Sequence, residues 1–243
     1  QTLLLEGDRG CGKTTLARIL AKNLMCGNPT EEGLACEECK SCVLMTEKFI
    51  LTGETPLGLP VYEIDITKSN SKEDAAKIVE TMRVKPMGNK KKVFILDEIQ
   101  RASPEAQNSY LKVSEEPGSF LYIILCTTDP EDLIDPFKSR FNSMKIRRSG
   151  VPEIVERLEE ICIAENIQYD ESALKLIALH QNRVPRECIN KLDVISIGGK
   201  ITYKDTVEEL QLVSSGLYQK YFELLNRDIY EAMKFIEDLY EEH

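Results

Sequence analysis

The segment Gly7-Asp-Arg-Gly-Cys-Gly-Lys-Thr14 has the residue types and spacing of a phosphate-binding loop, G-x-x-x-x-G-K-[ST]. It leaves a strand-like run and enters a helical pattern, so backbone N–H groups and the positive end of a helix would face a phosphate. Lys13 would reach the β- and γ-phosphates of a nucleotide, and Thr14 would bind its Mg²⁺. A glycine-rich turn before an ordinary helix is the alternative. The candidate nucleotide-binding residues of this segment are Gly7, Gly10, Gly12, Lys13, Thr14 and Thr15.

Two carboxylates close a second apolar run, Val93-Phe-Ile-Leu-Asp97-Glu98. A buried strand that ends in Asp97 would hold this carboxylate beside the phosphate-binding loop, where it can bind Mg²⁺ through water. Glu98 would then act on the water that attacks the γ-phosphate. Alone, the pattern is also typical of a strand that emerges at the surface. The phosphate-binding loop in the same chain favours the catalytic interpretation.

Four of the eight cysteines lie close together, in the pattern Cys26-x9-Cys36-x2-Cys39-x2-Cys42. Four thiolates with two C-x-x-C steps are typical of a tetrahedral zinc site. An iron–sulfur cluster or free structural cysteines are the alternatives. Because four protein ligands leave zinc no open coordination position, we expect a structural and not a catalytic metal.

Four short apolar runs predict the strands that would position these residues. Such runs, without polar alternation, are what parallel strands covered on both faces require. Helical patterns lie between them, and this alternation predicts an α/β domain with a parallel sheet over residues 1–150, with the zinc module at residues 26–42. The four runs are Thr2 to Leu5, Val61 to Ile66, Val93 to Leu96 and Leu121 to Thr127.

The rest of the chain reads as helices. Pro152 suits the first turn of one helix and Pro185 the first turn of another, with a helical apolar pattern around Leu174 between them. These signals predict a small all-helical domain over residues 151–212. A last amphipathic stretch follows, and we expect residues 213–243 to begin a further domain that the chain does not complete.

The composition restricts the class of protein and its surroundings. With 31 Lys and Arg against 41 Asp and Glu, the net charge of −10 argues against binding nucleic acid by bulk electrostatics alone. Contact with DNA would be local, or would arise from several subunits. The longest apolar run, Phe120 to Cys126, is far shorter than the ~20 residues of a membrane helix, so we expect no membrane span. Clustered cysteines favour a metal site in a reducing compartment, here the cytoplasm.

The motifs occur together in the order found in one family. The chain resembles the AAA+ clamp-loader ATPases, which include the bacterial DNA polymerase III gamma/tau subunit and replication factor C. The resemblance covers Gln1 to about Leu212, and it implies an AAA+ ATPase domain, a helical lid domain and the start of a helical collar for oligomerisation. Besides the phosphate-binding loop and the cysteine module after its helix, the shared runs are Val61 to Asp65, Ala106 to Pro117 and Leu125 to Pro130.

The resemblance implies roles for three further residues. Thr128 corresponds to the sensor-1 position that contacts the γ-phosphate. Arg140, in Ser139-Arg-Phe141, corresponds to the arginine that acts on ATP bound by the neighbouring subunit, although phenylalanine replaces the family's cysteine. Arg186 corresponds to sensor 2 at the start of a lid helix, with Arg183 where the family has a small residue. A strand-capping hydroxyl, a lone surface arginine and a helix-start residue are the respective alternatives.

The function implied by the resemblance is an ATP-hydrolysing subunit that opens and loads a sliding clamp on primer–template DNA. Its expected cofactors are ATP, Mg²⁺ and Zn²⁺. Its expected partners are other clamp-loader subunits in a hetero- or homo-oligomeric ring, the clamp and DNA. The expected catalytic set is Lys13, Glu98, Thr128 and Arg140. The candidate DNA contacts, which a solvated loop would equally explain, are Lys90, Lys91, Lys92 and Arg101.

Three other functions share parts of this pattern. A non-hydrolysing delta-prime-like stator has the zinc module and the Ser-Arg element, but intact Lys13, Thr14 and Glu98 argue against it. A zinc-containing nucleotide kinase places its metal in a lid far from the phosphate-binding loop, whereas here the cysteines follow the loop's helix at once. A zinc module for interaction alone would have no use for the Asp97–Glu98 pair.

Overall fold

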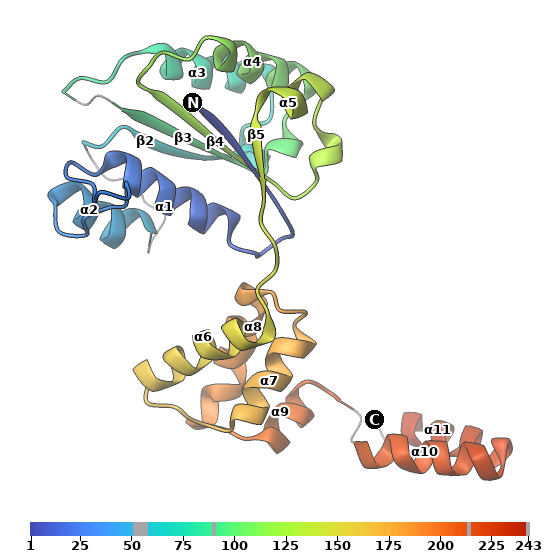
Figure 1. Ribbon diagram of the computed structural model, residues 1–243. Helices are drawn as coiled ribbons and strands as arrows, with labels where there is room; N and C mark the ends of the chain where they lie inside the picture. Colours follow the sequence, from blue (N-terminus) through green and yellow to red (C-terminus); the bar gives the residue numbers. More distant parts are fainter. Residues whose placement is uncertain (51–57, 89–90, 213–214, 242–243) are drawn as a thin grey trace. The chain divides into compact units, whose positions relative to one another are not determined.

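The computed structural model of the chain describes residues 1–50, 58–88, 91–212 and 215–241. These residues form two compact units, Gln1–Arg148 and Ser149–His243 (Figure 1). The first unit holds a five-stranded sheet with helices on both faces, and the second is built mainly of helices. Within the described residues, no helix is both long enough and apolar enough to cross a membrane.

The sheet has the order β2-β3-β4-β1-β5, and every neighbouring pair is parallel. The four apolar runs of the sequence form β1 to β4 with ends shifted by at most one residue, which confirms the predicted parallel α/β fold. No pattern in the sequence predicts β5, because this edge strand exposes all four of its side chains and has no apolar run. The strands are β1 (Thr2–Glu6), β2 (Val61–Asp65), β3 (Lys92–Asp97), β4 (Leu121–Thr127) and β5 (Asn142–Lys145).

Helices cover both faces of the sheet because the central strands are apolar on both sides. In β3, Phe94 and Leu96 pack into the core formed with α3 and α4, whereas Val93 and Ile95 pack into the core formed with α1. Figure 1 shows α1 and α2 on one face, and α3 and α4 on the other. The helices of this unit are α1 (Lys13–Met25), α2 (Lys40–Leu44), α3 (Lys72–Arg83), α4 (Pro104–Glu115) and α5 (Asp135–Arg140).

The second unit has its own apolar core, centred on Leu158, Leu174 and Leu192. The expectation of an all-helical domain is wrong in one detail, because β6 (Gln168–Tyr169) and β7 (Lys200–Ile201) pair in parallel. A strand of two residues is too short to leave a periodic pattern in the sequence. The helices are α6 (Val151–Ala164), α7 (Glu171–His180), α8 (Pro185–Ile195), α9 (Tyr203–Glu209), α10 (Ser215–Arg227) and α11 (Ile229–Glu241).

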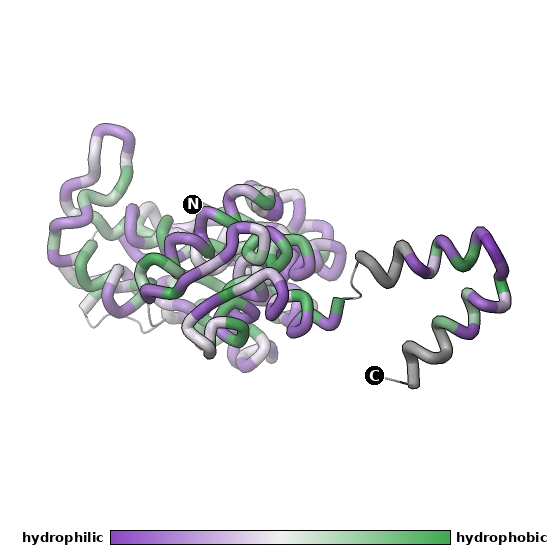
Figure 2. The backbone as a smooth tube through the Cα atoms, turned by 90° about the horizontal axis from the view of Figure 1, so that it is seen from below, coloured by the Kyte–Doolittle hydropathy of each residue, from purple (hydrophilic) through white to green (hydrophobic). Residues whose placement is uncertain are grey.

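The helices α10 and α11 pack against each other and leave large apolar side chains in solvent. Apolar and polar residues alternate along their coloured parts in Figure 2. Two helices have too little shared surface to bury all their apolar residues. The exposed ones are Phe222, Leu225, Ile229, Tyr230 and Met233.

A buried lysine ties β3 to the end of α3. Lys92 is only 3% exposed, and its Nζ donates to the carbonyl groups of Thr81 and Val84, the latter at 2.8 Å. The Tyr62 and Phe94 rings lie 5.5 and 5.7 Å from the same nitrogen. Burial lowers the pKa of this ammonium group. Lys92 therefore caps a helix C-terminus, where cations are favoured.

The burial of Lys92 removes it from the predicted DNA contacts. The ammonium group of Lys92 is buried and bonded within the chain, so it is not available to a DNA phosphate. Lys91 is half-buried and Arg101 is exposed, so their side chains remain candidates. Lys90 lies outside the described residues.

We predict that Lys92→Met lowers the free energy of unfolding by about 1–3 kcal/mol, because two carbonyl groups at the end of α3 lose their donor. Urea denaturation followed by circular dichroism at pH 7 measures this change. The matched control is Lys91→Met, for which we expect a change below about 0.5 kcal/mol. Equal destabilisation by both variants would contradict the capping role of Lys92.

Candidate functional site

The loop between β1 and α1 needs glycine at three positions for steric reasons. Gly10 and Gly12 have φ angles of 76° and 97°, in the left-handed region that favours glycine. A Cβ atom on Gly7 would lie 2.6 Å from the carbonyl oxygen of Ile146, which follows β5. The loop is thus folded tightly against the end of the sheet, and α1 begins directly after Gly12, its last glycine.

Lys13 lies across this loop, 6% exposed. Its Nζ donates to the carbonyl oxygens of Gly7 and Asp8, each at 2.8 Å. The carbonyl groups of Gly7 and Asp8 therefore keep the Lys13 ammonium group at the place where a loop of this type binds phosphates. Thr15, also in the predicted set, is exposed on the first turn of α1.

Thr14 and Asp97 meet although 83 residues separate them. The Thr14 hydroxyl donates to Asp97 Oδ2 at 2.7 Å, and Asp97 Oδ1 accepts the backbone N–H of Glu98 at 3.0 Å. Hydroxyl and carboxylate oxygens are ligands that Mg²⁺ prefers in proteins. The two predicted magnesium-binding residues are thus brought together beside Lys13.

Glu98 and Thr128 are linked through a residue that the sequence analysis missed, Gln100. Glu98 follows β3 with a left-handed backbone (φ 55°), and Thr128 follows β4. The amide Nε2 of Gln100 donates to Glu98 Oε2 at 2.6 Å and to Thr128 Oγ1 at 2.7 Å. No sequence motif assigns a role to a glutamine at position 100. Its place two residues after Glu98 is the one feature of the sequence that could have drawn attention to it.

Arg140 lies at the opposite edge of the sheet from the loop of its own chain. Asn142, two residues further on, pairs with Leu3 near the start of β1, whereas the loop begins at Gly7 beyond the end of β1. The four residue steps from Leu3 to Gly7 span roughly 13 Å at about 3.3 Å per residue, so Asn142 lies about this far from the start of the loop. The exposed guanidinium group donates to the carbonyl oxygen of Glu115 at 3.3 Å. The structure therefore does not bring Arg140 to its own phosphate-binding loop.

Arg186 belongs to the second compact unit, where it is exposed in the first turn of α8. Pro185 precedes it at the first helical position, and Arg183 has a left-handed backbone with a φ angle of 59°. The assignment of Arg186 to sensor 2 stays a prediction.

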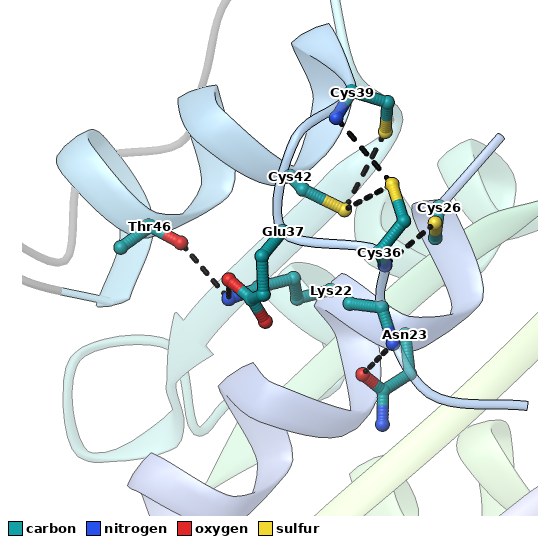
Figure 3. Close-up of polar contacts among 9 residues, drawn as sticks. Lys22, Asn23, Cys26, Cys36, Glu37, Cys39, Cys42 and Thr46 are labelled. Atoms are coloured by element: carbon teal, nitrogen blue, oxygen red, sulfur yellow. Dashed lines mark hydrogen bonds and ion pairs between the residues drawn. The ribbon is translucent and has the colours of Figure 1, made fainter. Parts of the chain in front are cut away.

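The four clustered cysteines converge on one point. Their Sγ atoms lie within 4.8 Å of one another, with Cys36 and Cys39 at 4.0 and 3.4 Å from Cys42 (Figure 3). A tetrahedral zinc ion with bonds of about 2.3 Å would set sulfur atoms roughly 3.8 Å apart. All eight cysteines are free, so no disulfide competes for these thiols. The donor set and its geometry therefore fit zinc.

Backbone N–H groups support the cluster. The N–H of Cys36 donates to Cys26 Sγ at 3.3 Å, and the N–H of Cys39 donates to Cys36 Sγ at 3.4 Å. Backbone N–H groups of Gly27 and Cys42 lower the pKa of the Cys39 thiol to about 6. Burial instead raises the pKa of the Cys42 thiol. Such N–H donors stabilise thiolates, which are the form that binds metals.

Side chains of α1 anchor the loop that carries the cysteines. Lys22, 7% exposed, contacts the Glu37 carboxylate and donates to Thr46 Oγ1 at 2.9 Å (Figure 3). Asn23 Oδ1 accepts the backbone N–H of Ala35 at 3.0 Å. The cysteine cluster is thus attached to the same helix that begins at the phosphate-binding loop.

The fold and this site define a class of protein. A phosphate-binding loop after β1, carboxylates at the end of β3 and a parallel sheet followed by a helical unit are the arrangement of AAA+ proteins. The Holliday junction branch migration motor RuvB of Thermotoga maritima matches with a TM-score of 0.61, covering 95% of this chain and 69% of that chain. At 16% sequence identity, this likeness concerns the fold alone.

The family follows from sequence comparison. The family model described as DNA polymerase III, delta subunit, matches residues 1–149, and the chain belongs to this family. The DNA polymerase III subunit gamma of Buchnera aphidicola (subspecies Acyrthosiphon pisum) is 34% identical over 86% of this chain, and the tau subunit of Bacillus subtilis is 31% identical over 94%. The resemblance to gamma/tau subunits is thereby confirmed. The chain spans 56% and 38% of the length of these two relatives.

Proposed function

We propose that the chain is the ATP-hydrolysing subunit of a DNA replication clamp loader, which loads a sliding clamp onto primer–template DNA. The observation that carries the hydrolytic part is the 2.7 Å hydrogen bond between Thr14 and Asp97 beside Lys13. It brings together residues that would bind phosphate and magnesium, and Glu98 is the next residue after Asp97. The names of the gamma and tau relatives support the replication part.

The residues of the site divide the work of phosphoryl transfer. The ammonium group of Lys13 would exchange its bonds to Gly7 and Asp8 for bonds to the β- and γ-phosphates of ATP. Thr14 would hold Mg²⁺ directly and Asp97 through water. The metal ion, when bound, neutralises charge on the phosphates. Glu98 would orient the attacking water, and the Thr128 hydroxyl would donate a hydrogen bond to the γ-phosphate.

A non-hydrolysing stator is the second candidate, because the matching family description names a delta subunit. Such a subunit has no need of a complete hydrolytic set. Here Lys13, Thr14, Asp97 and Glu98 are all present and lie at one edge of the sheet. This completeness supports hydrolysis over the stator function.

Assembly into a ring is part of the proposal. Arg140 lies on the sheet edge away from its own loop, which supports action on ATP held by a neighbouring subunit. The exposed apolar residues of α10 and α11 support the start of a collar that other subunits would cover. The zinc ion of Cys26, Cys36, Cys39 and Cys42 would be structural, and Arg186 would contact nucleotide from the helical lid.

We predict that Glu98→Gln lowers ATP hydrolysis about 10²–10⁴-fold and leaves ATP affinity nearly unchanged, because the amide keeps the shape but not the basicity of the carboxylate. Lys13→Ala should instead weaken ATP binding itself. Phosphate release by the assembled complex and binding of a fluorescent ATP analogue measure the two effects. Hydrolysis at the normal rate by Glu98→Gln would contradict the assignment.

We predict that the purified chain contains about one zinc ion, and that Cys39→Ser lowers both zinc content and thermal stability. Plasma mass spectrometry and differential scanning fluorimetry measure these. The matched control is Cys11→Ser, outside the cluster, which should keep its zinc. Iron in place of zinc, or full zinc content in Cys39→Ser, would contradict the structural zinc site.

We predict that Arg140→Ala and Lys13→Ala are each nearly inactive alone. When the two variants are mixed with each other, in the presence of the remaining loader subunits, ATP hydrolysis should recover. An interface between one intact loop and one intact arginine would then form, and a missing trans arginine costs about 10³–10⁵ in rate. The control Lys138→Ala, an exposed cation in the same helix, should keep full activity. No recovery in a mixture shown to have assembled would exclude action in trans.

A further inference from the structure

Gln100 holds a buried position between the ends of β3 and β4. It lies in the short turn Ile99–Arg101 that follows Glu98, and the residue is 7% exposed. A buried amide carries two donors and an acceptor, and each costs free energy unless it is bonded. Because the amide of Gln100 is buried, each of its polar atoms needs a hydrogen-bond partner within the protein.

Every polar atom of the Gln100 amide has a partner. Nε2 donates to Glu98 Oε2 at 2.6 Å and to Thr128 Oγ1 at 2.7 Å, and Oε1 accepts the hydroxyl of Thr127 at 2.9 Å. The Thr127 hydroxyl in turn accepts the backbone N–H of Asp129 at 3.2 Å. A flipped amide would place its oxygen against the Glu98 carboxylate, so this network fixes the amide orientation.

The Thr128 hydroxyl has one proton, which it donates to Asp129 Oδ2 at 2.6 Å. A γ-phosphate oxygen at this hydroxyl would compete with Asp129 for that proton. The N–H of Gln100 bonds to the oxygen of Thr128, so it is compatible with either acceptor. The link from Thr128 through Gln100 to Glu98 can therefore persist when phosphate binds.

We propose that Gln100 is a positioning residue for ATP hydrolysis, whose amide joins the Glu98 carboxylate to the Thr128 hydroxyl. This inference rests on the proposed ATP hydrolysis. Gln100 holds Oε2 of Glu98 and leaves Oε1 for the attacking water. A γ-phosphate that orders Thr128 thereby also orders Glu98, because both side chains bond to one amide nitrogen. Without this amide, the half-buried carboxylate would sample rotamers that do not face the water.

Two substitutions at this position test the proposal in the full chain assembled with its partner subunits. Gln100→Met keeps the length of the side chain but removes both N–H donors. We expect kcat to fall on the order of 10²-fold while KM for ATP stays within about twofold. Gln100→Glu keeps the shape but places a second carboxylate beside Glu98. Repulsion between the two carboxylates would turn Glu98 away from the attacking water, so we expect kcat to fall at least as far as in Gln100→Met.

A double-substitution cycle tests the link to Thr128. Gln100→Met should cost much less kcat in a Thr128→Val background than in the wild type, because contacting residues are not additive. Additive losses, or a fall in kcat matched by a rise in KM, would each overturn the positioning role. Loss of the folded state in Gln100→Met, measured by circular dichroism, would overturn it as well. If wild type hydrolyses ATP and Gln100→Met matches it, this inference alone fails. If the assembled wild type does not hydrolyse ATP, the proposed function fails.

Discussion

The hydrogen bond between Thr14 and Asp97 is the contact on which the arrangement of this site depends. It joins the helix after β1 to the end of β3, with β4 lying between these strands in the sheet. Parallel strands make this possible, because their carboxyl ends all meet at one edge. The loop, the two carboxylates and Thr128 each lie at the carboxyl end of a different strand. Their proximity is a property of the sheet and not of any local segment.

The parallel sheet also keeps Arg140 away from the phosphate-binding loop of its own chain. Arg140 precedes β5, so it lies at the amino ends of the strands, opposite the phosphate-binding loop. One chain thus presents the phosphate-binding loop at one edge and the Arg140 guanidinium group at the other. A head-to-tail ring of subunits is the assembly in which two such edges face each other. Under the proposed function, ATP hydrolysis depends on assembly.

Three buried polar side chains connect elements of this fold. Lys92 caps α3, Lys22 holds the cysteine loop, and Gln100 joins the ends of β3 and β4. Each is nearly buried and each bonds to groups from other elements. A buried polar group costs free energy unless it is satisfied, so each of these contacts restricts the fold to one arrangement. The cysteine cluster adds a further connection directly after α1.

The sequence by itself determined the class of fold and most of the site. Apolar runs specify β1 to β4, and the glycine and cysteine spacings select the loop and the cluster, because these are local patterns. Only the tertiary structure showed that Lys92 is a helix cap, that Gln100 links Glu98 to Thr128, and that β5 completes the sheet. These three depend on contacts between different elements of secondary structure. No local periodicity records such contacts, because the partner of a polar side chain is decided by how the strands are ordered.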